Sequence, residues 1–304
     1  MSEIQEDNVI DNKKIVLKDE LFKILKQISK DTVPLYPDLC NVVTRGIEIG
    51  QKSNIGRCKS CGNYQEADKK YYSPDIKNCS NCNEQPLKLM DIQCISSQTK
   101  TKQYIKKCIA GKHIQAYEIL NDSYFIPQSL DGIDYKERHF SGNKILVKRI
   151  SPQLVGAFSS ETLYAFNTVY TIRNNSLNKF DFMIILAIIN SSLMHFYHEL
   201  YYNLGMKLTT LITIDWIKKL PIRLPKNEKM KNDIITCVES MISLNELHMK
   251  DNTKEIALLK EIDDLVYELY EINNDTLLLA GNEPGLGHKI DWDYIERHRI
   301  KILK

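Results

Sequence analysis

Four cysteines between residues 58 and 82 are the part of the sequence best suited to chemistry. Cys58 and Cys61 form one C-x2-C pair, and Cys79 and Cys82 form a second, with seventeen residues between the pairs. Zinc favours thiolate ligands and takes four of them in closed structural sites, so this spacing is typical of a tetrahedral zinc site. Four thiols without a metal and an iron–sulfur cluster are the alternatives. The sequence predicts a structural Zn2+ held by these four cysteines.

The residues around the cysteines favour the same interpretation. Gly62 and Asn83 follow the second cysteine of each pair, where a metal-binding turn needs residues that tolerate a positive φ. The stretch YQEADKKYYS, residues 64–73, has too few aliphatic side chains to form a core. We therefore expect the metal to hold residues 57–83 together as an inserted, zinc-ribbon-like lobe. The isolated Cys40, Cys94, Cys108 and Cys237 are expected to be small buried apolar residues.

No stretch of the sequence predicts catalysis. Binding of S-adenosylmethionine would need a glycine-rich loop after a strand, and GNEPGLG at residues 281–287 follows a predicted helix instead. The Asn/Asp-Pro-Pro-Tyr/Phe tetrapeptide of amino-methylating enzymes requires a Pro-Pro pair, which the sequence lacks. A nuclease core could start at Pro74-Asp75, but Pro86 stands where that pattern needs lysine. We therefore predict no catalytic residue in this chain.

Charge is distributed unevenly along the chain. The formal net charge is +2, yet residues 41–225 contain 24 basic and 15 acidic side chains, and both flanking regions are net acidic. A basic middle region suggests contact with a polyanion, and chance variation in surface charge is the alternative. The amino terminus is polar, and the longest apolar run, Phe182–Ile189, is too short to span a bilayer. We expect a cytoplasmic protein with no membrane partner.

The elements that must position these residues are short and of mixed type, so the expected fold class is α+β. An amphipathic helix is predicted over Lys18–Ser29, within an N-terminal segment of residues 1–34. Residues 35–225 are predicted to form a domain of short strands with one long helix near residues 179–202. Within that domain, KQYIKKCI is expected to be a short helix. Residues 226–273 are predicted to form a helical hairpin, and residues 274–304 a tail.

Six segments occur in an order that resembles a known family. They are VVTRGIEIGQ, CIAGKHIQAYEI, NKILVKRISPQLVGAF, TVYTIRN, ILAIINSSLMHFYHELYY and LPIRLP. Over residues 35–272 the chain resembles the TaqI-like specificity domain, the target-recognition part of adenine-N6 DNA methyltransferases in fused restriction–modification enzymes and phage-defence methylases. The resemblance implies that a separate methyltransferase domain or subunit binds S-adenosylmethionine. This chain would then be the recognition half, as a split subunit or a truncated protein, and the zinc lobe departs from the family pattern.

The resemblance also implies a mechanism and a set of contacts. Double-stranded DNA would lie between the recognition and catalytic domains, with the target adenine flipped into the latter. Arg45 and Lys112 are the favoured contacts, because each adjoins a glycine that lets backbone approach the duplex. The full set of candidates is Arg45, Glu48, Lys52, Lys112, His113, Lys148, Arg149, Arg173 and Asn174. The competing hypotheses are a subunit-assembly protein with a zinc-stabilised lobe, and an intact methyltransferase or nuclease whose motifs are not recognised.

Overall fold

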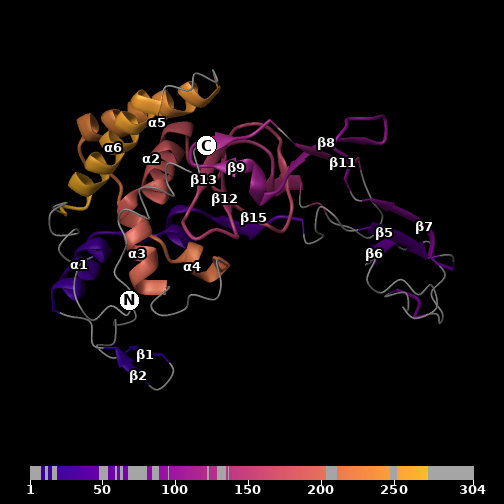
Figure 1. Cartoon of the computed structure of the whole chain (residues 1–304), viewed down its shortest axis with the longest axis horizontal. Helices are drawn as coiled ribbons and strands as arrows, with labels where there is room; N and C mark the ends of the chain where they lie inside the picture. The colour runs from indigo at the N-terminus through magenta and orange to yellow at the C-terminus, as the bar shows by residue number, and fades with distance from the viewer. Residues whose placement is uncertain are drawn as a thin grey trace.

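The computed structural model has the predicted mixed α+β architecture (Figure 1). Its helices are α1 (Asp19–Ser29), α2 (Lys179–Asn190), α3 (Ser192–Tyr202), α4 (Ile214–Lys218), α5 (Glu228–Glu246) and α6 (Asn252–Leu269). The structure describes residues 8–10, 13–15, 19–47, 54–58, 60–61, 64–67, 81–83, 89–94, 96–121, 123–128, 135, 137–202, 211–246 and 252–272. The predicted tail at residues 274–304 lies outside these ranges.

A four-stranded antiparallel sheet forms the centre of the molecule. Its strands, in spatial order, are β13 (Gly156–Ser159), β12 (Lys144–Lys148), β15 (Val169–Arg173) and β4 (Val42–Arg45). Successive side chains of a strand point to opposite faces of a sheet. Accordingly, Ile145 and Val147 enter one hydrophobic core, whereas Leu146 enters a second core on the other face. The central sheet is therefore buried on both sides.

Helices cover the first face of this sheet. The larger core extends from Ile24 in α1 through Phe182–Ile189 of α2, which are all buried, to Ile272 beyond α6. Helices α5 and α6 lie side by side over α2 (Figure 1). A short pair of strands, β3 (Val33–Pro34) and β16 (Pro221–Ile222), joins the two ends of the expected recognition domain. The expected boundaries at residues 34 and 225 therefore both fall within one continuous core.

A smaller sheet covers the second face. It contains β11 (Tyr124–Pro127), β8 (Tyr104–Ile109) and β14 (Tyr164–Ala165), in that spatial order. Its inner side chains pack with Leu146 and Val169 of the central sheet. The prediction of a helix for KQYIKKCI was wrong, because most of this segment is β8, which pairs with β11 from Tyr104 to Cys108. The remaining short pair in this half is β9 (Ile114–Gln115) with β10 (Glu118–Ile119).

The long helix predicted near residues 179–202 is two helices. Ser191 has an extended backbone, with ψ of 152°, and separates α2 from α3. Asp263 of α6 accepts hydrogen bonds from the backbone N–H and the hydroxyl of Ser192, so it caps the start of α3. Within the described ranges, no single helix has the length and apolarity to cross a bilayer. Among the described helices, only α2 and Ser192–His198 taken together reach that length and apolarity, and the two helices are bent by 57° relative to each other.

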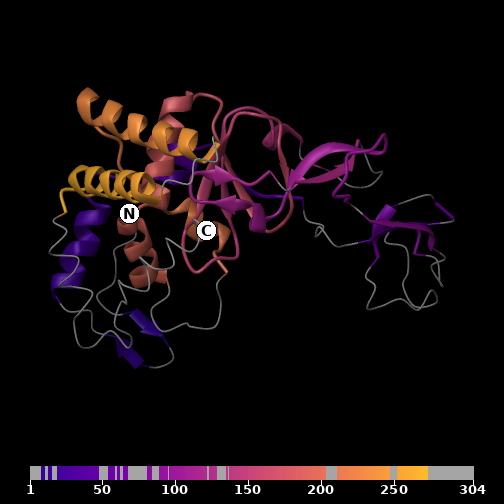
Figure 2. The same ribbon diagram turned by 45° about the horizontal axis from the view of Figure 1, so that its top comes forward.

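The region of the predicted metal lobe contains a third sheet. It consists of β6 (Tyr64–Ala67), β5 (Asn54–Cys58) and β7 (Leu89–Cys94), paired antiparallel around β5. In both views this sheet lies apart from the helices and from the central sheet (Figures 1 and 2). A further short pair, β1 (Asn8–Ile10) with β2 (Lys13–Ile15), lies near the amino terminus.

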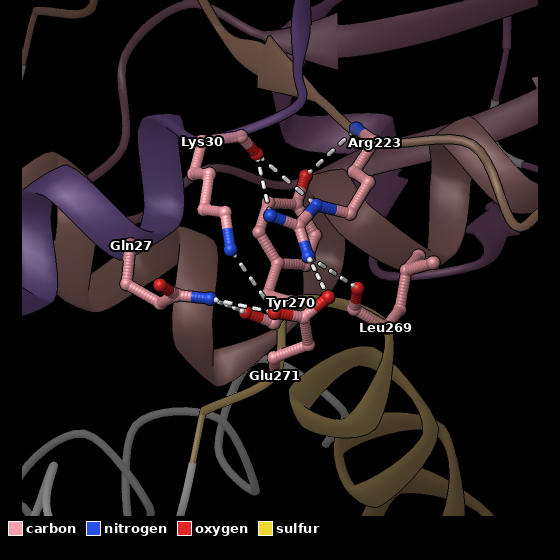
Figure 3. Close-up of polar contacts among 6 residues, drawn as sticks. All are labelled: Gln27, Lys30, Arg223, Leu269, Tyr270 and Glu271. Carbon is pink, nitrogen blue, oxygen red and sulfur yellow. Dashed lines mark hydrogen bonds and ion pairs between the residues drawn. The ribbon is translucent and has the colours of Figure 1, made fainter.

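A buried arginine joins the two ends of the described chain (Figure 3). The Arg223 guanidinium donates hydrogen bonds to the carbonyl of Lys30, at the end of α1, and to the carbonyl of Leu269 in α6 at 3.0 Å. The Tyr270 hydroxyl accepts the Arg223 backbone N–H at 3.2 Å and donates to the Pro221 carbonyl at 2.7 Å. Arg223 is only 6% exposed. These contacts, the Arg223 clasp, tie α1 and α6 to β16.

We predict that Arg223→Met lowers the free energy of unfolding by about 2–4 kcal/mol, because it leaves buried carbonyls without donors. Urea unfolding monitored by far-UV circular dichroism measures this change. Glu271→Gln is the matched control: that side chain lies 3.4 Å from the arginine but is 60% exposed. Its removal should cost less than about 0.5 kcal/mol. Equal losses for the two variants would contradict a structural role for the buried hydrogen bonds.

Candidate nucleic-acid interface

The turn between β14 and β15 organises one end of the central sheet. The carbonyl of Thr168 accepts the backbone N–H of Arg149 at 3.0 Å, and its hydroxyl accepts the backbone N–H of Gly111 at 2.9 Å. The neighbouring carbonyl of Val169 accepts the backbone N–H of Gly46 at 3.0 Å. Three segments that are far apart in the sequence, ending β4, β8 and β12, therefore meet at this turn.

Four of the predicted contact residues lie on these segments, and we call them the basic end: Arg45, Lys112, Lys148 and Arg149. The register places Lys148 opposite Val169 and Arg45 opposite Tyr170, at one end of β15. The Lys112 side chain is exposed, and the other three are half-buried. The pairing thus places four cations at one end of the sheet, with Lys148 on the face of Val169 and Arg45 on the opposite face, that of Tyr170.

Glycines at the basic end permit close packing of backbone. A Cβ on Gly46 would lie 2.3 Å from the carbonyl oxygen of Phe166, and one on Gly111 would lie 2.9 Å from that of Thr168. These two positions therefore accept only glycine without a shift of the turn. We expected both glycines to let the backbone approach the duplex. In the structure they instead let the backbone approach the β14–β15 turn.

Neighbouring groups hold the cations of the basic end in place. The Lys112 ammonium lies 5.1 Å from the ring centroid of Tyr124, within the range of a cation–π interaction. Nη1 of Arg149 donates to the carbonyl of Asn167 at 3.2 Å. Burial lowers the pKa of Lys148, since the half-buried ammonium loses hydration. An anion bound at this end would restore favourable interactions for that charge.

His113 does not belong to the surface of the basic end, contrary to the prediction. The side chain is 2% exposed, and its Nδ1 accepts the backbone N–H of Ala110 at 3.1 Å. Its ring also packs against Tyr124, with 5.2 Å between the ring centroids. His113 therefore shapes the turn that carries Lys112, and a buried ring cannot reach DNA without opening this turn.

Arg173 and Asn174 lie at the opposite end of β15. The Arg173 guanidinium donates to the carbonyl of Arg138, to the hydroxyl of Ser141 at 3.2 Å and to Oδ1 of Asn175 at 2.7 Å. The Asn174 amide donates to the carbonyl of Leu39 at 2.8 Å. Both side chains hold loops of this chain together and are separated from the basic end by the length of β15. Of the other candidates, Glu48 and Lys52 lie outside the described residues.

Asn167 and Thr168 were not predicted from the sequence, although they position two of the four cations: both bind Arg149, and Thr168 binds Gly111 beside Lys112. They carry no charge, so a search for basic residues passes over them. The available signal is turn chemistry, because this polar pair separates two strand-like runs, LYAF and VYTIR.

The predicted metal ligands are only partly within the described residues. Cys61 is exposed and Cys82 is half-buried, each in a turn, whereas Cys79 and the side chain of Cys58 are outside the described part. Asn83 has a φ of 56°, which confirms the positive φ predicted after the second cysteine of that pair. No group of three or more metal-binding side chains occurs among the residues that the structure describes.

Comparison with known proteins finds a match to a specificity-domain family over part of the chain. Residues 106–222 match the family described as the TaqI-like C-terminal specificity domain, and the resemblance noted from the order of segments is confirmed. One similar solved structure is a Type IIL restriction–modification enzyme, MmeI, in complex with DNA, at 11% identity and a TM-score of 0.37, covering 65% of this chain and 31% of that chain. Another belongs to a type I restriction–modification system, at 12% identity and a TM-score of 0.31, covering 87% and 52%. The chain thus spans less than two thirds of either protein. No curated protein matches the sequence.

Proposed function

We propose that the chain recognises duplex DNA for an adenine-specific restriction–modification or phage-defence methyltransferase, because residues 106–222 match the TaqI-like C-terminal specificity domain. Target recognition in such a system depends on contacts to base edges and to phosphates. The chain would present the duplex to a catalytic domain or subunit that binds S-adenosylmethionine and receives the flipped adenine. We place this activity in the cytoplasm.

The basic end is the observation that carries the proposal. Lys112, Lys148 and Arg149 fall within the matched range, and Arg45 joins them through the pairing of β4 with β15. Lysine and arginine side chains neutralise phosphates, which supplies most of the affinity in non-specific DNA binding. Their backbone is fixed by the β14–β15 turn, so little ordering is required when DNA binds. Acidic flanking regions favour DNA contact through residues 41–225 alone.

We assign the other parts of the chain supporting roles. In this proposal α5 and α6 form the helical hairpin expected from the sequence, and they stabilise the central sheet from the face covered by helices. Cys58, Cys61, Cys79 and Cys82 bind one structural Zn2+ in a zinc-ribbon-like lobe that adds to target choice. The chemistry of the four thiolates and the positive φ of Asn83 support the metal assignment.

We predict that the chain binds random-sequence duplex DNA with strong dependence on salt. Four phosphate contacts give a log–log slope of about −3.6, or roughly a hundredfold loss of affinity between 50 and 200 mM salt. Removing two contacts with Arg45→Ala and Lys112→Ala should reduce the magnitude of the slope by about 1.8, without unfolding the protein. Fluorescence anisotropy measures both slopes.

The matched control is Lys229→Ala with Lys260→Ala, which removes two exposed lysines of α5 and α6. This pair should leave the slope unchanged. If the wild-type chain shows no salt-sensitive binding at 50 mM salt, the DNA-recognition proposal is wrong and the subunit-assembly hypothesis replaces it. If the Arg45 and Lys112 variant binds like the wild type, the basic end is not the contact surface.

We predict one zinc per chain in protein purified without chelator, and Cys61→Ser should reduce the zinc content by at least half. Elemental analysis by mass spectrometry measures both values. The two cores have no described member between Ile47 and Cys108, so the urea midpoint of the main unfolding transition should change little in this variant. Wild-type protein without metal, or a variant that retains full zinc, would contradict the assignment.

A further inference from the structure

The outer half of β8 pairs with β11, and Ser97 forms an isolated antiparallel bridge with Phe125 on the other edge of β11. Strand β14 pairs only with Cys108 and Ile109 of β8, whereas β11 continues along Tyr104–Lys107. Among the described strands, β11 is therefore the only partner of this half of β8. Both views show β8 and β11 projecting away from the helices (Figures 1 and 2). We call Tyr104–Lys107 with its β11 partners the ribbon.

The two faces of the ribbon differ in what covers them. On the inner face, the ammonium of Lys106 lies 2.8 Å from a carboxylate oxygen of Glu137 and 5.0 Å from the ring centroid of Tyr164. On the outer face, Ile105 is 38% exposed and Lys107 lies directly opposite the half-buried Phe125. Within the described part of the chain, Lys107 has no ion pair. The outer face thus combines an uncompensated cation with apolar side chains.

The turn that precedes the ribbon adds two further cations. The hydroxyl of Thr101 accepts the backbone N–H groups of Gln103 and Tyr104 at 3.3 and 3.1 Å, and the Thr101 N–H donates to the Tyr104 carbonyl at 3.0 Å. These bonds fix a tight turn on which Lys100 and Lys102 are exposed. The cations at the tip are therefore held on an ordered backbone.

We infer that the ribbon enters the major groove of the DNA. That groove is about 12 Å wide and admits a two-stranded β-ribbon, whose strands lie about 4.8 Å apart. Beyond the Ser97 bridge, the described part of the ribbon has two strands, Tyr104–Lys106 and Ile126–Pro127. Lys100 and Lys102 at the tip would contact phosphates, and Lys107 with Ile105 would reach base edges, where an aliphatic side chain can pack on a thymine methyl group. Strand β8 leads directly to Lys112, so the ribbon extends the basic end. This inference rests on the proposed function and adds to it the part of the chain that contacts base edges.

The first test is the salt slope of the variant Lys102→Ala with Lys107→Ala in the full chain. Loss of the Lys102 phosphate contact should reduce the slope by about 0.9, and loss of the Lys107 base contact should weaken binding further, by about 1–3 kcal/mol. Lys229→Ala with Lys260→Ala is again the matched control and should leave the slope unchanged. Thermal unfolding of the variant should match the wild type, because neither lysine lies in a core.

The second test identifies the groove. Wild-type complexes with random-sequence duplex at 50 mM salt are challenged with methyl green, a cationic ligand of the major groove, and with distamycin, a cationic ligand of the minor groove. We expect methyl green to displace the protein at lower concentration than distamycin. Displacement by distamycin alone would overturn the inference.

The outcomes also separate the ribbon from the basic end. If the Arg45 and Lys112 variant loses slope while the Lys102 and Lys107 variant does not, DNA recognition stands and the ribbon has no part in it. If the wild-type chain does not bind DNA at all but binds an acidic protein through the ribbon, both the inference and the proposed function fail.

Discussion

Burial of the central sheet on both faces is the constraint on which the rest of the structure depends. Ile145, Leu146 and Val147 are all fully buried, although consecutive side chains of β12 point in opposite directions. A strand with no solvent face can place charged groups only near its ends. This explains why Lys148, Arg149 and Arg45 gather where β12 and β4 end, and why Arg173 lies at the other end of β15.

The two layers on either side of the sheet then have different tasks. The helical layer supplies most of the buried apolar surface, and the Arg223 clasp connects its first and last helices to the end of the matched range. The layer containing β8 and β11 is smaller and leaves half of β8 outside the body. A rigid body with a projecting ribbon allows the ribbon to enter the major groove while the cations at the strand ends contact the DNA phosphates.

Much of this architecture could be predicted from the sequence, because helical periodicity is a strong signal. The helix over Lys18–Ser29 was confirmed as α1, with Ile24, Leu25 and Ile28 buried as one stripe. The error at β8 has a clear cause: Tyr104, Ile105, Cys108 and Ile109 have the spacing of a helical stripe. In the structure, the half-buried Lys106 points inward, where its ammonium contacts Glu137 and the rings of Tyr135 and Tyr164, so an inward-facing lysine concealed the alternation of a strand.

The candidate site was predicted less well than the fold, for reasons of register and burial. Basic residues could be found by type, but only strand pairing shows that Lys148 lies at the same end as Arg45 and that Arg173 does not. His113 looks like a surface contact beside Lys112, yet its hydrogen bond to Ala110 places it inside. Asn167 and Thr168 position the cations through backbone carbonyls and a hydroxyl, which no search for charge detects.

The central claim is that DNA meets the basic end and the ribbon and leaves the helical layer exposed. Lysine acetylation footprinting with mass spectrometry tests this most directly, because it reports each side chain in the unmodified protein. With duplex DNA bound at low salt, the account predicts slower acetylation of Lys102, Lys107 and Lys112, and unchanged acetylation of Lys229 and Lys260 on α5 and α6. Protection of Lys229 and Lys260, with Lys107 and Lys112 still reactive, would contradict it.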